Sequence, residues 1–447
     1  MNAILHQYDV YPKVIPIHTE TELTICPIGE KRKFEGEYIV QFCVLAHGEG
    51  EWMLYEYPVT AGEDGALHFT GNLPEEGEYF IRVFKDGSQL FKMSVYALEH
   101  DLANRIPLRG DLHLHTYRSD GKQDPATVCA NYRKMGLDFL VITDHHRYYP
   151  SLEAIHAYRD ADMALNILPG EEVHLPMTGV HIVNAGGLYS INGLLDSNAQ
   201  FKECGVDLTK RSMYGEAPAM ITEDEYKKQI EEIMASEACS DCPERVDKQS
   251  YAVCCWAFDR IREAGGLGIF AHPFWISYQY NVAIPLTRYL LKKHPFDAFE
   301  VLGGENYFDQ NGLQTAIYYE EYKEGRVHPI VGSTDSHDST ENNRNRAICS
   351  TIVFAPVNER EAILQSIRDK YSVAVDTISA EYRLVGEFRL QRYACFLMHN
   401  WYPLHDRLAA ADGEIMREYC AAEADASELA VMKKKAEAMF RKYFKTI

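Results

Sequence analysis

The sequence of 447 residues has no uninterrupted apolar run of about 18 residues, the length that a membrane-spanning helix requires. Residues 1–12 also lack the basic segment and the apolar segment of a secretory signal peptide. We therefore expect a cytoplasmic protein with no membrane partner.

Positive charge is scarce. The chain has 45 Lys and Arg residues against 66 Asp and Glu residues, which gives a formal net charge of −21. Binding to nucleic acid regardless of its sequence needs a basic surface, so this charge argues against it. We expect no sequence-specific nucleic-acid partner either. A small anionic substrate held by a few local cations stays compatible with the composition, and an oligomer is left open.

A regular disulfide framework is also missing. The eleven cysteines are odd in number, scattered and without a secretion signal, so we interpret most of them as reduced thiols. Cys239 and Cys242, together with Cys254 and Cys255, invite comparison with a zinc ribbon. Adjacent cysteines make awkward co-ligands, and free thiols are therefore favoured over a structural metal.

The length predicts two or three domains. Residues 13–100 contain short runs that alternate apolar with polar side chains, and glycine-containing turns separate these runs. This pattern predicts an all-β sandwich domain over residues 1–104. A packing and orienting role is favoured for it over binding of a sugar or a protein.

From residue 105 the pattern changes to apolar strands that alternate with helices, which predicts a parallel sheet or barrel over residues 105–385. Residues 188–250 interrupt it with a polar, acidic stretch that contains one predicted helix over residues 223–235. We interpret this stretch as an insertion that caps the barrel. Residues 386–447 are predicted to form a short helical C-terminal segment.

The stretch Leu112-His113-Leu114-His115 carries the first chemical signal. Side chains on a strand repeat every two residues, so His113 and His115 share one face and can chelate a metal. Further histidines and carboxylates lie at or just past the ends of other apolar strands: His145, Glu172, His181, His272, Asp335 and His337. Active sites of barrels are built at the C-terminal ends of their strands, so we expect these side chains to converge.

The donor types favour particular metals. Neutral imidazoles with a few carboxylates suit Zn, Mn or Fe, whereas Mg and Ca prefer mostly oxygen ligands. Several divalent ions close together also need negative charge, which Asp120, Glu172 and Asp335 would supply. A carboxylate can bridge two metals, and Glu172 is the residue that we predict to do so.

These motifs together resemble the PHP (polymerase and histidinol phosphatase) superfamily. The resemblance covers roughly residues 106–380 with every motif in order. It rests on His113-Leu114-His115-Thr116 with Ser119-Asp120-Gly121, Ile142-Thr143-Asp144-His145, Pro169-Gly170-Glu171-Glu172, the strand residue His181, Ala271-His272-Pro273 and Ser333-Thr334-Asp335-Ser336-His337.

The resemblance implies a fold and an activity. The fold is a distorted (β/α)7 TIM-like barrel, here preceded by the sandwich and followed by the helical segment. The activity is a metal-dependent phosphoesterase that cleaves phosphate esters of a small phosphorylated metabolite or nucleotide through a metal-activated hydroxide. Hydrolysis of a non-phosphate ester, lactone or amide, and a catalytically silent binding protein, are the alternatives.

The resemblance also implies a ligand set for two or three divalent transition-metal ions. His113, His115, Glu172 and Asp335 would hold the first metal. Glu172, His181 and His272 would hold the second. Asp120, His145 and His337 would hold the third. Glu172, Asp335 and His272 are predicted as the catalytic residues.

Some assignments stay open at this level. Glu171 competes with Glu172, and His146 with His145, as the ligand. His174 is predicted to contact substrate or support the ligands, although it could compete with His181. The predicted phosphate-binding cations follow the metal motifs: Arg118, Arg147, Arg344 and Arg346. Asp111, Asp144 and Asp338 are expected to orient the ligating histidines.

Overall fold

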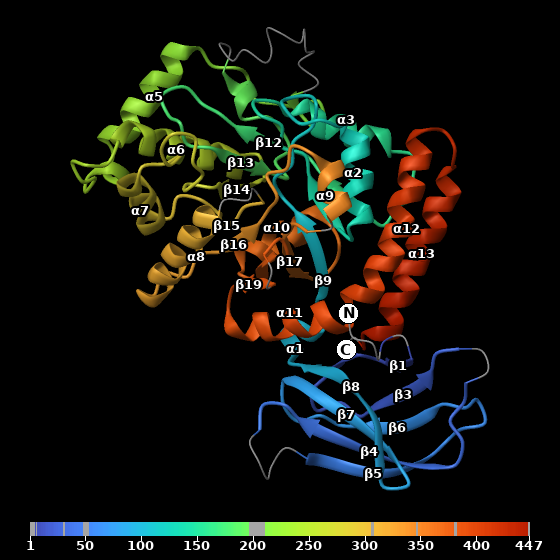
Figure 1. Ribbon diagram of the computed structural model, residues 1–447. Helices are drawn as coiled ribbons and strands as arrows, with labels where there is room; N and C mark the ends of the chain where they lie inside the picture. The colour runs from blue at the N-terminus through green and yellow to red at the C-terminus, as the bar shows by residue number, and fades with distance from the viewer. Residues whose placement is uncertain are drawn as a thin grey trace. The chain divides into compact units, whose positions relative to one another are not determined.

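The computed structural model describes residues 5, 7–29, 32–47, 53–195, 211–304, 308–345, 347–379 and 382–445. The chain divides into two compact units (Figure 1). The first contains residues 1–105, 388–408 and 431–447, and the second contains residues 106–387 and 409–430.

The first unit is built on two β-sheets, which confirms the predicted β-rich N-terminal region. The three-stranded sheet has the order β1 (Tyr8–Tyr11), β3 (Thr21–Pro27), β6 (Leu67–Gly71). The five-stranded sheet has the order β2 (Val14–Pro16), β8 (Ser88–Leu98), β7 (Gly77–Lys85), β4 (Glu37–Val44), β5 (Met53–Thr60). Alternate residues of both sheets, such as Leu23, Val40 and Ile81, meet in one buried core.

Two helices of the first unit are held to its sheets by polar contacts. The short helix α1 (His100–Ala103) and the helix α11 (Phe388–Asn400) are joined through Arg389, whose guanidinium pairs with Asp101 and with Glu76 at 2.6 Å each. Bidentate pairing of this kind fixes the orientation of the helix better than a single contact would.

The second unit begins with a six-stranded sheet of order β11 (Asn166–Leu168), β10 (Phe139–Val141), β9 (Ile106–Asp111), β17 (Cys349–Ala355), β18 (Ser372–Asp376), β19 (Arg383–Val385). Strands β9, β10 and β11 run parallel, and the others pair antiparallel. Every residue of β10, β17 and β18 is buried, as expected of strands covered on both faces.

A second sheet of five strands completes this unit. Its order is β12 (Gly170–Val173), β13 (Ile182–Ala185), β14 (Leu267–Phe270), β15 (Ala298–Leu302), β16 (Ile330–Gly332). The mixed α/β class is therefore confirmed. Within the described part of the chain, however, strand pairing gives two separate sheets and no closed barrel.

Helices connect the strands of the second unit: α2 (Pro125–Lys134), α3 (Tyr149–Ala157), α6 (Lys248–Glu263), α7 (Ile284–Lys293), α8 (Phe308–Lys323), α9 (Ser339–Asn345) and α10 (Arg360–Arg368). Helices α6, α7 and α8 lie along one side of the second sheet (Figure 1). Helix α2 begins as its sequence predicts, because Asp124 accepts a hydrogen bond from the Thr127 amide and Pro125 occupies the first turn.

The predicted helix in the insertion is confirmed as α5 (Glu223–Ala235). A capping box starts it, since Thr222 and Glu225 exchange hydrogen bonds. The insertion also contains two short 3-10 turns, η2 (Asn192–Leu194) and η4 (Glu237–Cys239). Tyr226 is fully buried against Trp256, with ring centroids 5.1 Å apart. Part of the predicted insertion, residues 196–210, lies outside the described residues.

The C-terminal segment is helical, as predicted, and consists of α12 (Tyr402–Cys420) and α13 (Ala426–Tyr443) after α11. No helix in the described ranges combines the length and the apolar character that crossing a membrane would need. Helix α12 is tied to α2 by a buried ion pair, in which the Nε of Arg133 lies 2.6 Å from an Asp412 oxygen.

Substituting Arg133 by Met should destabilise the second unit by about 3–5 kcal/mol, because it leaves the buried Asp412 carboxylate without its cation. The neighbouring Lys134 pairs with Glu414 at the surface, so Lys134→Met is the matched control and should cost about 1 kcal/mol or less. Urea unfolding of both variants measures the difference. Equal losses of the free energy of unfolding in the two variants would show that burial of the Arg133–Asp412 pair is unimportant.

Candidate metal centre

The segment that follows β9 positions the first two histidines. Leu112 and Leu114 are fully buried in the core, so the alternation of the strand turns His113 and His115 to the opposite face. The His115 amide donates to the Ser336 carbonyl at 3.0 Å, which continues the pairing beyond the sheet. His113 and His115 therefore lie on the same face, as the sequence predicts.

Glu172 is the centre of the cluster. It lies on β12 and is fully buried. Its Oε1 is 2.8 Å from Nδ1 of His181 and 3.5 Å from Nε2 of His272. Its Oε2 faces Nε2 of His113 and of His115 at 3.6 Å each, Nε2 of His174 at 3.3 Å, and Nδ1 of His145. One carboxylate thus faces six imidazoles.

Asp335 closes the cluster from the loop after β16. Its Oδ1 lies 3.0 Å from Nε2 of His115 and 3.3 Å from Nε2 of His113, and its Oδ2 lies 3.8 Å from Nε2 of His272. The backbone of Asp335 has φ +50° and that of His272 has φ +21°. Such values are costly for residues other than glycine and occur where the surrounding structure enforces them, often at functional sites.

A third group lies at the more exposed edge of the cluster. Asp120 contacts Nε2 of His337 at 3.2 Å and Nε2 of His145 at 3.5 Å. The side chain of Asp120 is 56% exposed, whereas that of Glu172 is fully buried. The ring of His115 stacks on that of His337 with centroids 4.3 Å apart, so this group is continuous with the first.

The histidines control the ionisation of the two central carboxylates. Burial by itself would raise the pKa of Glu172, but the charges of its histidine neighbours, His181 foremost, outweigh burial and hold that pKa well below its usual range. Burial would likewise raise the pKa of Asp335, but its histidine neighbours, His113 foremost, outweigh burial and lower that pKa. Both side chains are therefore carboxylates at neutral pH, the form that binds metal.

Several buried polar atoms of the cluster make no hydrogen bond. They include both carboxylate oxygens of Glu172, Nε2 of His113, and Nδ1 of His181 and His272. Buried polar groups are nearly always satisfied, so atoms that face one another without bonding need another partner. Divalent metals bind such carboxylate oxygens and imidazole nitrogens, and the residues present fit a metal centre.

The nine predicted ligands are all part of one connected cluster. Their ligand atoms form overlapping groups in which all atoms lie within 4.8 Å of one another, among them His115 with Asp120, His145 and His337; His113 with His115 and Glu172; and Glu172 with His181 and His272. Asp335 joins through the contacts given above. That these residues hold metal remains a prediction.

The two neighbouring glutamates, Glu171 and Glu172, face different surroundings in the structure. Glu171 points to the other face of β12, where its carboxylate accepts hydrogen bonds from Asn192, from the Ser190 hydroxyl and from the Ile191 amide. Glu172 alone of the two faces the histidines. His145 likewise contacts Glu172 and Asp120, whereas the ring of His146 lies against His174 with centroids 4.5 Å apart.

The predicted substrate-binding residues have different surroundings. His174 lies inside the cluster, with Nε2 2.9 Å from Nδ1 of His145. Arg118 forms a bidentate pair with Glu153 at 2.7 and 2.8 Å. The Arg147 amide donates to the Asp144 carbonyl. The side chain of Arg344 and the whole of Arg346 lie outside the described residues. The substrate-binding roles stay predictions.

The three aspartates that were expected to orient histidine rings bond elsewhere. Asp111 accepts hydrogen bonds from the amides of His113 and Thr334, and so holds the backbone of two ligand segments. Asp144 accepts from Thr116 and Ser119, and Asp338 accepts from Gln123 and Lys122. These carboxylates fix loops rather than rings.

Glu300 on β15 contacts the ring of a predicted ligand, His113. The sequence motifs do not predict this residue. Its Oε2 lies 2.9 Å from Nδ1 of His113, and its Oε1 accepts from the His272 amide at 3.3 Å. A carboxylate on the second ring nitrogen fixes the orientation of a metal-binding histidine and increases its basicity. The only available signal was a glutamate within an otherwise apolar strand.

The fold and the cluster together define an α/β protein with a candidate metal centre of histidines and carboxylates. A family model described as PHP domain matches residues 111–243. This match covers part of the chain, and it confirms the resemblance that the motifs indicate.

The solved structures that match the chain are distant in sequence. A two-domain protein from Bacteroides vulgatus, which contains a predicted PHP-like metal-dependent phosphoesterase, is 16% identical, with a TM-score of 0.42 and coverage of 66% of this chain and 71% of that one. A candidate metal-dependent phosphoesterase from Bifidobacterium adolescentis is 19% identical, with a TM-score of 0.32 and coverage of 51% and 87%. An amidohydrolase from Chromobacterium violaceum is 19% identical, with a TM-score of 0.30 and coverage of 52% and 88%. No curated protein matches the chain.

Glu172→Gln should lose at least one metal equivalent per chain, because the neutral amide cannot replace a carboxylate shared by several imidazoles. Elemental analysis after dialysis against Zn or Mn measures it. Glu171→Gln is the matched control, since it alters the adjacent buried carboxylate on the opposite face, and it should keep the metal content of the wild type. Equal metal loss in both variants would contradict the central role of Glu172.

Glu300→Gln should weaken metal binding by about 10- to 100-fold, because the carboxylate on Nδ1 of His113 is replaced by a neutral group. Competition with a chromophoric chelator gives the affinity, and circular dichroism of the metal-free variant checks that the fold is kept. An unchanged metal affinity would show that Glu300 does not support the metal ligands and only packs in the core.

Proposed function

We propose that this protein is a metal-dependent hydrolase that cleaves phosphate esters of a small phosphorylated metabolite or nucleotide. The observation that carries the proposal is the convergence of histidines and carboxylates from separate strand ends on the buried Glu172. The PHP domain match over residues 111–243 supports the same conclusion.

The contacts support a division of the ligands into three groups. His113 and His115 face both Oε2 of Glu172 and Oδ1 of Asp335, whereas His181 and His272 face Oε1 of Glu172. In this proposal Glu172 would be shared by two metals of the Zn, Mn or Fe type. The more exposed third group is Asp120, His145 and His337.

Contacts at the seams of the two sheets support a distorted (β/α)7 barrel. At one seam the amide of Glu172 donates to the Thr143 carbonyl at 3.1 Å, which links β12 to the end of β10. At the other seam the hydroxyl of Thr351 on β17 donates to the Gly332 carbonyl of β16 at 2.8 Å. We propose that the two sheets are the halves of one such barrel.

Bound divalent metals would supply Lewis acidity and lower the pKa of a coordinated water toward about 7. The protein's own contribution is to hold Glu172 and Asp335 as carboxylates and to aim imidazole nitrogens at one centre. A neutral His113 that donates a hydrogen bond from Nδ1 to Oε2 of Glu300 would direct the lone pair of its Nε2 toward Glu172 and Asp335. Burial of these side chains excludes bulk water from the centre.

The remaining assignments are also proposals. The first unit acts in packing and orienting, and the insertion around α5 covers the site and selects small substrates. Glu172, Asp335 and His272 are proposed as the residues nearest to the reacting atoms.

Metal-loaded protein should release phosphate from at least one of a panel of small phosphate monoesters and diesters. Asp335→Asn should lower kcat/KM by more than about a hundredfold, because it removes a negative ligand shared by three histidines. Asp309→Asn, at an exposed position on α8, is the control and should match the wild type.

Product analysis with non-phosphorylated esters, lactones and amides runs beside this panel. Hydrolysis of these compounds without release of phosphate from any ester would contradict the proposed bond specificity. Identical behaviour of Asp335→Asn and the wild type would contradict the proposed site.

A further inference from the structure

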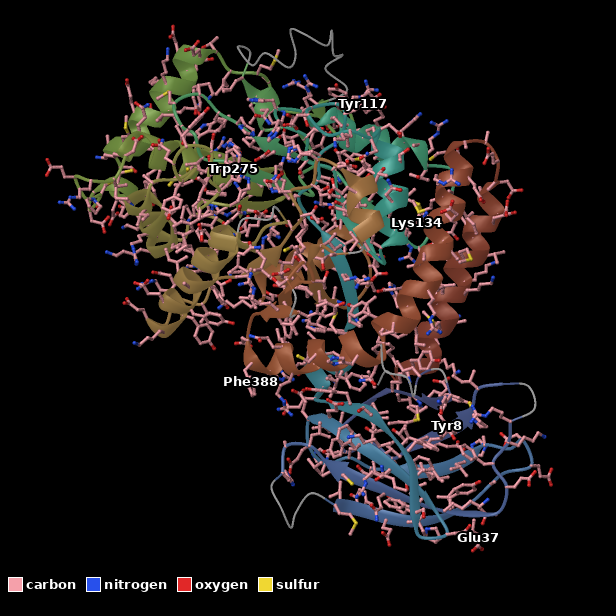
Figure 2. The ribbon with its side chains drawn as sticks, in the orientation of Figure 1. Tyr8, Glu37, Tyr117, Lys134, Trp275 and Phe388 are labelled. Carbon is pink, nitrogen blue, oxygen red and sulfur yellow. The ribbon has the colours of Figure 1, made fainter. Side chains whose placement is uncertain are left out.

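The loop that joins β14 to α7 places a tryptophan beside the metal centre. Trp275, labelled in Figure 2, follows the predicted ligand His272 by three residues. Its ring centroid lies 6.1 Å from that of His272 and 6.2 Å from that of His181. Trp275 is half-buried, so it lies against the histidines and still presents surface to the outside.

The loop that carries Trp275 is well ordered by its own contacts. Ile276 and Tyr280 pair as an antiparallel bridge, and the Asn281 amide donates to the Trp275 carbonyl at 2.8 Å. Phe274 is 4% exposed and packs edge-on against Tyr280 at 5.3 Å. The core of this hairpin is therefore Phe274.

Two cations that follow the first metal motif in the sequence are each paired with a carboxylate. Arg118 is held by both oxygens of Glu153, and Lys122 lies 3.0 Å from Asp338. With a net charge of −21, the chain does not favour a substrate that carries further phosphate groups. An aromatic surface beside the centre favours a flat, uncharged group instead.

We propose that Trp275 is a stacking platform that selects phosphate esters whose leaving group carries an aromatic ring. This proposal rests on the proposed phosphoesterase function. A phosphate bound to the metal that Glu172, His181 and His272 would hold would bring such a ring next to the indole. The competing role for Trp275 is to shield the two histidines from water, which would give no preference for aromatic rings.

Binding is tested first, because it does not depend on turnover. Calorimetry compares benzylphosphonate with cyclohexylmethylphosphonate on metal-loaded protein; the two have similar size, but only the first has a π face. The wild type should bind the benzyl compound roughly tenfold tighter or more. Trp275→Leu should abolish the preference and Trp275→Phe should keep most of it.

Tyr278→Ala is the control within the same hairpin, since Tyr278 is fully exposed at its tip, and it should leave the preference unchanged. Elemental analysis must show wild-type metal content in each variant, and Trp275→Met replaces Trp275→Leu if that variant loses metal. Equal binding of both phosphonates by the wild type, binding of neither, or an unchanged preference in Trp275→Leu would overturn the proposal.

Measuring turnover distinguishes the proposed role of Trp275 from the proposed phosphoesterase function. The ratio of kcat/KM for benzyl phosphate over cyclohexylmethyl phosphate should fall about tenfold in Trp275→Leu. A preference in binding without phosphate release from any ester of the panel would refute the phosphoesterase function and keep the platform. Adenosine 5′-monophosphate and 4-nitrophenyl phosphate then distinguish the two sources of such a ring, a nucleobase and a phenol.

Discussion

The burial of the Glu172 carboxylate is the constraint on which the rest of the site depends. A carboxylate without compensating charge is costly in the interior of a protein. Glu172 is compensated by imidazoles that come from the ends of β9, β10, β13 and β14. The C-terminal ends of β9, β10 and β14 and the start of β13 therefore have to lie near one another. In this way the chemistry of one side chain restricts the topology of the whole unit.

The supporting structure keeps this arrangement rigid. Asp111 holds the backbone at His113 and Thr334 together, and Asp144 holds the turn that leads to Asp120. The left-handed backbone at Asp335 is a local cost that these contacts enforce. Such preorganisation places donor atoms before a metal arrives, so less is lost in ordering them on binding.

Many of the candidate ligands and several helices could be predicted from the sequence, because strand alternation and family motifs are local patterns. The spacing of His113 and His115 predicts a shared face, and the pattern over residues 223–235 predicts the helix that is α5. Glu300 was not recognised, because one glutamate in an apolar strand has no motif and its partner His113 is distant in sequence. The pairing of Arg118 with Glu153 and the division of the strands into two sheets also depend on tertiary contacts, which local patterns do not encode.

The central claim is that Glu172 is shared between metals rather than neutralised by protonated histidines alone. Anomalous diffraction from crystals of the Zn- or Mn-loaded protein tests it directly. The account predicts at least two anomalous peaks within bonding distance of the Glu172 oxygens, with His181 and Asp335 on different peaks. A fully folded, metal-loaded protein whose anomalous peaks all lie away from Glu172 would contradict it.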